Sequence, residues 1–471
     1  MSGPRKKVLA RLTAVGVAAL VAVLLPLSLC SAAVSWTVGG KTVCDTAGDQ
    51  LYPRAVSDGG TGTISVWLDK RTANNAIYAQ RLNSSGTSLW GATGKVVCDA
   101  VGEKYGPSIC GDGAGGAIVV WQEKRDTVWD IYAQRINSSG TRLWAASGAY
   151  VEPFNVDMKD PALVSDGAGG AIFAFQGNGM EIANRLDGTG AGKWFLGMKA
   201  GNGTSAPAIE SDGKKGAYVV WQTGTQMWAN HFNTSGGEAW NSASGLQVTT
   251  AANVFMYDGA ICTDNSGGVI FAWRDQRSGK SKIYAERVIN LTINSTSAGA
   301  VLWTLGGKIV ADGVNDQMYA RLSTDTANKS IVTWSDMGAH YDVYAQKLDS
   351  SGNRTWGTTG RLITTGTATS DQRYSIHSTD GAGGAFFEYI EGGGGVFDLI
   401  AGRINSAGTV LWKQNISDKD QTYYNSCYQT PGSMVYVGSN KAVAVWSDNR
   451  GDINWFPETW TGEGIYAQQL Y

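Results

Sequence analysis

The chain alternates short apolar runs with polar turns over almost its whole length. In one unit an Asp-Gly turn precedes the apolar run Thr63–Trp67, and a second run, Ile77–Leu82, leads into Asn-Ser-Ser-Gly. Short apolar runs bounded by residues that accept positive φ are typical of antiparallel strands joined by hairpins. After residue 33 no window shows a sustained apolar period of 3.6 residues, so the pattern predicts an all-β protein.

The unit repeats along the chain. The segment IYAQRLNSSGTSLW ends at Trp90 and returns as IYAQRINSSGTRLW ending at Trp144, and the final IYAQ-like strand is Ile465–Tyr471. Weaker copies end at Trp194, Trp240, Trp303, Trp356 and Trp412. The tryptophans lie 46 to 63 residues apart, about 54 on average (376 residues over the seven steps from Trp36 to Trp412), and the IYAQ-like strand occurs eight times. This period is expected for four-stranded propeller blades.

Each unit is expected to supply four strands: strand a before the Asp-Gly turn, strand b ending in Trp, strand c with IYAQ, and strand d after Leu-Trp. The motif W-x-x-x-G-K-x-V-C spans both Trp36–Cys44 and Trp90–Cys98, so the chain after residue 33 begins with a strand d and ends after a strand c. Pairing these two strands removes two exposed sheet edges. We therefore predict one domain, residues 34–471, that forms an eight-bladed β-propeller of four-stranded antiparallel blades closed by its N-terminal strand.

The repeat resembles that of PQQ-like (quinoprotein-type) propellers, which are also eight-bladed and carry Ala…Thr-Gly…Trp docking motifs on their outer strands. Here the matching residues are Ala79, Ser85-Gly86 and Trp90, with a spacing one residue longer. The resemblance implies a shared architecture and no shared catalysis. The repeat also resembles the IYAQR…LW repeats of uncharacterised secreted prokaryotic proteins across nearly the whole chain after residue 33.

Residues 1–33 have the pattern of a signal peptide. Lys6, Lys7 and Arg11 precede the apolar run Leu12–Leu29, and Ser31-Ala32-Ala33 offers small residues for cleavage. We expect an exported protein, extracellular, on the cell surface or periplasmic, without membrane insertion once the signal is removed. The alternative is an uncleaved anchor, because the apolar run is just long enough to span a bilayer.

Charge and composition exclude several classes of function. The formal net charge of the chain is −2. Residues 1–33 contain four basic residues and no acidic one, so the remaining residues carry a net charge of about −6. An acidic chain without a basic cluster is not expected to bind nucleic acid. With three histidines and no Cys-x-x-Cys, we expect no metal or cofactor. The cysteines are expected to be small buried thiols, with Cys44–Cys427 the one pairing to test.

The first candidate site lies in the b–c and d–a loops at one end of the ring. A Trp-x-Asp/Glu-x-Arg motif occurs at Trp67/Asp69/Arg71, Trp121/Glu123/Arg125, Trp273/Asp275/Arg277 and Trp446/Asp448/Arg450. An Asp-Gln pair recurs at Asp49-Gln50, Asp316-Gln317, Asp371-Gln372 and Asp420-Gln421. Such residues could bind a ligand, but their recurrence favours hydrogen bonding within each blade.

Three tryptophans depart from the repeat. Trp129 is expected in the b–c loop of blade 2, and Trp455 and Trp460 in that of blade 8. Aromatic side chains beside carboxylates suit stacking on sugar rings or anchoring a protein partner. They are therefore candidate ligand-binding residues.

Blade 7 holds the candidate catalytic residues. His377 stands where strand a elsewhere has Ile109, and Glu388 where strand b has Val120, with Glu391 just beyond. In the usual register we expect His377 and Glu388 to share one sheet face as diagonal neighbours, which would allow acid–base chemistry. The alternative is a substituted core position satisfied by local hydrogen bonds.

Three functions follow as hypotheses. The leading one is an exported binding or scaffold protein that recognises a glycan or a surface protein through the loop face of the propeller. The second is a polysaccharide-active hydrolase or lyase with carboxylates in the propeller channel. The third is an architectural protein of an envelope layer or appendage. The sequence favours a non-enzymatic protein without deciding the question.

Overall fold

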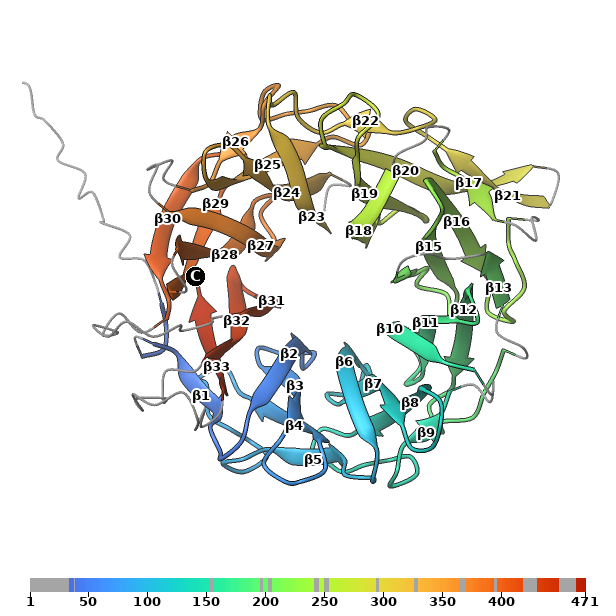
Figure 1. The fold of residues 1–471 in the computed structure, drawn as a ribbon, viewed down its shortest axis with the longest axis vertical. Coiled ribbons are helices and arrows are strands. Elements are labelled where there is room, and N and C mark those ends of the chain that lie inside the picture. Colours follow the sequence, from blue (N-terminus) through green and yellow to red (C-terminus); the bar gives the residue numbers. More distant parts are fainter. Residues whose placement is uncertain are drawn as a thin grey trace, which may run out of the picture.

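The structure is a computed structural model that describes residues 34–37, 39–151, 156–194, 198–201, 206–240, 245–249, 254–293, 296–325, 329–364, 370–393, 396–417, 430–448 and 463–471. Every regular element in these ranges is a β-strand, and the strands form eight separate sheets (Figure 1). The predicted all-β class is confirmed. Within the same ranges, no helix has the length and apolar character needed to cross a bilayer.

Each sheet is one blade of four antiparallel strands, taken in chain order from a to d. The strands of blades 1 to 4 are β2 (Gln50–Ser57), β3 (Thr63–Asp69), β4 (Ala76–Leu82) and β5 (Lys95–Cys98); β6 (Glu103–Gly111), β7 (Ala117–Lys124), β8 (Asp130–Ile136) and β9 (Ala149–Tyr150); β10 (Met158–Ser165), β11 (Ala171–Gly177), β12 (Met180–Leu186) and β13 (Met198–Gly201); β14 (Ala208–Ser211), β15 (Ala217–Thr223), β16 (Gln226–Phe232) and β17 (Leu246–Gln247).

The remaining blades follow the same plan, with one addition in blade 5. Their strands are β18 (Val254–Thr263), β19 (Gly268–Asp275), β20 (Lys282–Ile293) and β21 (Thr296–Val301), with β22 (Lys308–Ile309) also paired to β20; β23 (Asp316–Thr324), β24 (Ser330–Met337), β25 (Tyr341–Leu348) and β26 (Arg361–Leu362); β27 (Asp371–Thr379), β28 (Ala385–Gly393), β29 (Val396–Ile404) and β30 (Val410–Asn415); β31 (Thr430–Gly438), β32 (Lys441–Asp448), β33 (Gly464–Leu470) and β1 (Lys41–Cys44).

The strands a form the inner ring of the propeller. Each contacts the strand a of the next blade, from β2 through β6, β10, β14, β18, β23, β27 and β31 back to β2. Figure 1 shows these strands around the centre, with the strands d at the periphery. Side chains of the strands a are therefore the ones nearest the ring axis.

The last blade is completed by the N-terminal strand, as the sequence predicts. In blade 8 β1 lies beyond β33, with Lys41 opposite Ala467 and Thr42 opposite Tyr466. An isolated bridge between Val34 and Leu470 extends the pairing. The two ends of the described chain thus close the ring.

The repeated residues hold the blades together. Gln80 of the IYAQ strand is fully buried, donates to the Gly91 carbonyl at 2.5 Å and accepts from the Trp90 amide at 2.9 Å. The Trp90 indole then donates to the Ser138 carbonyl of the next blade at 3.1 Å, over Gly140, whose φ is +77°. A side chain on Gly140 would lie 2.8 to 3.1 Å from Lys95 and Trp90, so this position requires glycine.

Candidate functional site

The inner strands share a bulge near their start. In β2, β6, β10, β23 and β27 the pairing with strand b shifts there, and one residue of the bulge has positive φ. These residues are Tyr52 (56°), Gly106 (61°), Asp160 (55°), Tyr319 (59°) and Tyr374 (57°). A bulky side chain rarely adopts this conformation, and such strain is concentrated at functional sites.

The bulges lie at the end of the ring that carries the b–c and d–a loops, which we call the loop face. In blade 1 Gln50 pairs with Asp69 and Leu51 with Leu68, so the bulge stands beside the last residues of strand b. The b–c loop begins directly after Asp69. The strained tyrosines are therefore on the face where the sequence places the ligand site, and on its innermost strands.

Four tyrosines at these bulges form two ring pairs, and we call Tyr52, Tyr105, Tyr319 and Tyr374 the axial tyrosines. The centroids of Tyr52 and Tyr105 are 5.0 Å apart at an interplanar angle of 65°, and those of Tyr319 and Tyr374 are 4.6 Å apart at 57°. Tyr52, Tyr105 and Tyr374 are 40%, 44% and 38% exposed. Exposed aromatic rings held by a strained backbone are suited to contact a ligand.

Sequence reasoning missed the axial tyrosines, although a signal was present. The recurring Asp-Gln pair continues as Asp-Gln-x-Tyr at 49–52, 316–319, 371–374 and 420–423. In the first three copies the glutamine is buried, and Gln50, for example, donates to the Gly48 carbonyl at 2.6 Å. The fourth copy lies outside the described residues.

The Trp-x-Asp/Glu-x-Arg motif forms hydrogen-bond networks at the loop-face end of its blade, and in blade 1 the network reaches the preceding blade, since Arg71 Nη2 lies 3.2 Å from Cys44 Sγ of β1. Asp69 is fully buried and accepts from the Trp67 indole at 2.8 Å and from Nε of Arg71 at 2.8 Å. The Arg71 guanidinium carbon lies 3.9 Å from the centroid of the Tyr78 ring. Because the carboxylate has no exposed surface, only the arginine is open to a ligand.

Blades 2 and 8 repeat this arrangement. Glu123, also fully buried, accepts from Trp121 and Arg125 at 2.8 Å each and forms an ion pair with the buried Lys104 at 2.9 Å. Asp448 is 1% exposed and accepts from the Trp446 indole at 3.3 Å. Arg450 lies outside the described residues. In these blades the motif therefore packs the loop-face end of the sheet.

Of the three unrepeated tryptophans, the described residues include only Trp129. It is half-buried, its amide donates to Asp157 Oδ1 at 3.0 Å, and its carbonyl accepts from the Met158 amide at 2.7 Å. These bonds hold the b–c loop of blade 2 against the following d–a loop. Trp455 and Trp460 lie outside the described residues.

Asp157 also lines a cavity of about 320 Å³ on the loop face. Gln176 is one of the residues that line this cavity, and its side chain donates at 3.0 Å to Glu181, which is fully buried. Burial raises the pKa of Glu181 to about 8, so this acid is mostly protonated at neutral pH. The cavity is lined by Val156, Asp157, Lys159, Gln176, Gly177, Asn178 and Gly179.

The expected diagonal pair of His377 and Glu388 is wrong. His377 pairs with Phe387 and Glu388 with Ile376, so the two side chains lie on opposite faces of blade 7. The same register holds in blade 2, where Ile109 pairs with Val119. The turn between strands a and b fixes this register. In any blade with the same register, the positions equivalent to His377 and Glu388 therefore lie on opposite faces of the sheet.

The surroundings of the two residues differ accordingly. His377 Nδ1 is 3.0 Å from Thr333 Oγ1 of blade 6 and its Nε2 is 3.1 Å from the Ile331 carbonyl; burial lowers the pKa of His377 to about 4. Glu388 is fully buried, neither carboxyl oxygen has a hydrogen-bond partner, and burial raises its pKa well above 4.5. Glu391 instead accepts from the side chain of Gln372. The three residues do not form one site.

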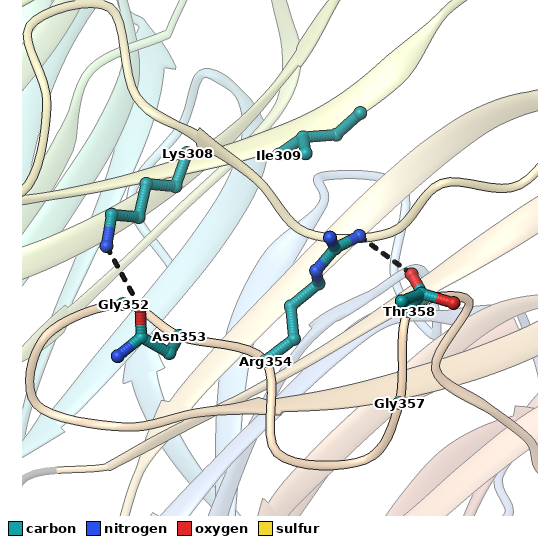
Figure 2. Close-up of a pocket in the computed structure, with 7 residues that line it drawn as sticks. All are labelled: Lys308, Ile309, Gly352, Asn353, Arg354, Gly357 and Thr358. Atoms are coloured by element: carbon teal, nitrogen blue, oxygen red, sulfur yellow. Dashed lines mark hydrogen bonds between the residues drawn. The ribbon is translucent and has the colours of Figure 1, made fainter.

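A second cavity, of about 480 Å³, lies between blades 5 and 6 (Figure 2). Its cations are already engaged by the protein: Lys308 donates to the Ser351 carbonyl at 2.6 Å, and Arg354 forms an ion pair with Asp312 at 2.7 Å. Figure 2 also shows Arg354 bonded to Thr358. This pocket belongs to the contact between the two blades.

The described residues contain no cluster of three or more metal-ligating side chains. Cys44, Cys98, Cys110 and Cys262 are buried free thiols, as expected for small core residues. Cys427 lies outside the described residues.

The sequence matches no family model and no curated protein. Solved structures are similar in fold at low identity. A Dyadobacter fermentans protein of unknown function is 12% identical with a TM-score of 0.40, covering 92% of this chain and 99% of that one. The Hadza microbial sialidase Hz136 is 10% identical with a TM-score of 0.35, covering 84% and 73%. Oligopeptidase B from Leishmania major is 8% identical with a TM-score of 0.46, covering 88% and 55%. Likeness at this level carries no functional inference.

Proposed function

We propose that the chain is an exported binding protein that recognises a glycan through the axial tyrosines of its loop face. The observation that carries the proposal is the pair of tyrosine contacts on the innermost strands, with three of the rings about two-fifths exposed. Sugar rings present C–H faces that pack on aromatic side chains, while their hydroxyls need polar partners nearby. Trp129, Trp455 and Trp460 are proposed to extend this surface, and residues 1–33 to direct export.

A polysaccharide-active enzyme is the second candidate from the sequence. Its proposed acid–base pair, His377 and Glu388, faces two different blade contacts and so gives this candidate no support. A surface protein as partner and an architectural role remain as outcomes of the experiment below.

The test is a glycan array probed with residues 34–471, followed by calorimetry on any saccharide bound. Tyr52→Ala and Tyr374→Ala should each weaken binding by about 1 kcal/mol or more, as expected for a contact aromatic. Tyr150→Ala is the matched control, because Tyr150 is 41% exposed but lies on β9 at the periphery. Binding that Tyr150→Ala weakens and the axial variants do not would overturn the proposal, as would an array without a hit.

A further inference from the structure

Arg373 places a positive charge at the loop-face end of the inner ring. It is the third residue of the Asp-Gln-x-Tyr motif in blade 7, and it is the last residue of β27 to pair with β28 before the bulge, opposite Ile390. Tyr374 follows it with a φ of 57°. The other three copies of the motif have an uncharged residue at this position: Leu51, Met318 and Thr422.

Three aromatic rings lie around the guanidinium group of Arg373. Its central carbon is 5.1 Å from the ring centroid of Tyr374, 5.5 Å from that of Tyr341 and 5.7 Å from that of Phe397. Tyr341 begins β25 of blade 6, whereas Tyr374 and Phe397 belong to strands a and c of blade 7. Rings within about 6 Å attract a cation, so side chains of two blades hold the guanidinium in place.

These rings are not accompanied by a carboxylate. Within the described residues Arg373 forms no ion pair, and its Nε is buried without a hydrogen-bond partner. The residue as a whole is partly exposed. Four other arginines lie over an aromatic ring, and each of these also forms an ion pair with an aspartate or glutamate: Arg71, Arg125, Arg277 and Arg403.

The carboxylates closest to Arg373 in sequence and in strand pairing bind other groups. Asp371 Oδ1 accepts from the Tyr341 amide at 3.3 Å and lies 3.7 Å from His340 Nδ1. Glu391 accepts from the side chain of Gln372. The charge of Arg373 therefore has aromatic neighbours and no anionic partner in the described part of the chain.

Tyr374 joins this arginine to the axial tyrosines. Its ring is 38% exposed, and its centroid lies 4.6 Å from that of Tyr319 on the neighbouring blade. A partly exposed guanidinium and an exposed aromatic ring are thus next to each other on the loop face.

We propose that Arg373 binds the anionic group of an acidic saccharide, a carboxylate or a sulfate, while the sugar ring that carries this group packs on Tyr374. This inference rests on the proposed function and adds the chemical class of the ligand.

The chemistry of the guanidinium group supports an anion as the ligand. Aromatic rings contact a guanidinium through its flat faces, which leaves the N–H groups at its edge for a ligand. This edge matches a carboxylate or sulfate with two parallel hydrogen bonds. Where water is partly excluded, the attraction between such a pair is stronger than in bulk water, and an unsatisfied donor is costly. Binding an anion therefore removes an unfavourable feature of the free protein.

The experiment measures by calorimetry the binding of four probes to residues 34–471: an oligogalacturonate, a sulfated galactan oligosaccharide, a neutral galactan oligosaccharide and an oligoglutamate. At least one acidic saccharide should bind more tightly than the neutral one and than oligoglutamate. Arg373→Met should weaken that binding at least tenfold, and a higher salt concentration should weaken it as well. Arg373→Lys keeps the charge but loses the planar fork, so it should also bind more weakly than the wild type. Which acidic saccharide binds identifies carboxylate or sulfate.

Arg361→Met is the matched control, because Arg361 is an exposed arginine on β26, the outermost strand of blade 6, and its replacement should leave binding unchanged. Melting temperatures of the free variants show that each is folded. The acidic saccharide should raise the melting temperature of the wild type and of Arg361→Met, but not that of Arg373→Met.

Three results would overturn the inference. Preference for the neutral saccharide, with dependence on Tyr52 and Tyr374, would exclude the anion site and leave the proposed function intact. Oligoglutamate bound as tightly as the acidic saccharides would assign Arg373 to an acidic protein partner. Acidic-saccharide binding that neither Arg373 variant changes would place the anion elsewhere on the protein.

Discussion

Glu388 lies among apolar side chains at the contact between blades 7 and 8. Its neighbours along strand b on the same face, Phe386 and Ile390, belong to the hydrophobic cluster that includes Trp446 of blade 8. A buried carboxyl group without a hydrogen-bond partner is costly even when neutral, and much more so when ionised. The protonated form is therefore the one that the folded protein retains.

This environment predicts a pH-dependent stability. Since the pKa of Glu388 is raised above 4.5 on folding, the folded state holds a proton that the unfolded state releases, and the free energy of unfolding falls as pH rises above 4.5 towards the raised pKa. Glu388→Met keeps the volume and removes the charge. It should be more stable than the wild type at pH 8 by about 1–3 kcal/mol, the cost of an unsatisfied buried polar group, and by less at pH 5.

Urea unfolding at pH 5 and pH 8 measures the effect. Glu103→Gln is the control, because Glu103 is exposed and should leave both values unchanged. If the wild type and Glu388→Met lose stability in parallel between the two pH values, Glu388 is not the titrating group.

At this scale the sequence identified unusual residues but not their contacts. Glu388 is visible as a departure from a repeat that elsewhere has Val120 or Val220. Its separation from His377 depends on which residues face each other across the a–b turn, and a shift of one residue reverses the face. A repeat in the sequence shows which positions are equivalent in different blades. Which residues face each other across strands a and b depends on the geometry of the turn between them, and the repeat does not show that geometry.

On the scale of one element, the a–b hairpin of seven blades carries an aspartate that pairs with a basic side chain of strand c: arginine in five blades, histidine in one and lysine in one. The pairs are Asp58–Arg81, Asp112–Arg135, Asp166–Arg185, Asp212–His231, Asp264–Arg287, Asp325–Lys347 and Asp380–Arg403. Asp58 Oδ1 accepts from the Gly60 and Gly62 amides at 2.9 and 3.0 Å, and Oδ2 from Arg81 at 2.8 Å. The Asp-Gly signal that predicted a turn is therefore also an ion-pair site.

Asp58→Asn tests the contribution of this charge. Burial raises the pKa of Asp58, but hydrogen bonds from Arg81, Gly60 and Gly62 outweigh it and hold the pKa below 3.8. A lowered folded pKa gives stability that is present above 3.8 and is lost as pH falls through the folded pKa. The variant should lose about 1.5–3 kcal/mol at neutral pH, as for hydrogen bonds to a charged group, and this difference should shrink in acid.

Urea unfolding at pH 7 and pH 2.5 separates the two cases. Asp99→Asn is the matched control, because the Asp99 side chain is 62% exposed and its pair with Arg142 should contribute little. A difference between Asp58→Asn and wild type that is equal at both pH values would assign the loss to packing and not to charge.

The blade could be predicted from the sequence because its residues recur for structural reasons. Gln80 and Trp90 make the same bonds as Gln134 and Trp144, so each repeat reports one local geometry. The axial tyrosines were missed for the converse reason. Their role depends on the inner strands meeting around one axis, a relation between blades that no single repeat contains.

On the scale of the whole molecule, closure rests on a strand from the opposite end of the described chain. Trp36, Val43 and Cys44 are buried in one cluster with Val445, Ile465 and Ala467 of the last blade. The Trp36 amide donates to Gln468 Oε1 at 3.2 Å, and the Gln468 side chain donates to the Thr37 carbonyl at 2.8 Å. The N-terminal segment therefore repeats, across the junction, the bonds that join strands c and d within blades 1, 2 and 6.

Removing residues 34–46 should open the ring. The deletion leaves β33 as an exposed edge and removes the buried side chains of Trp36, Val43 and Cys44 from the core of blade 8. At roughly 1.5–3 kcal/mol for each large buried apolar side chain, we expect a loss of about 5 kcal/mol and aggregation through the free edge. Calorimetry measures the loss of stability and size-exclusion chromatography measures the aggregation, each in comparison with the protein of residues 34–471. A synthetic peptide of residues 34–46, added in trans, should restore part of the melting temperature by adding a strand to β33, whereas a peptide with Trp36 and Val43 changed to Asp should not. A truncated monomer that melts with the intact domain would mean that the other seven blades hold the ring closed without this strand.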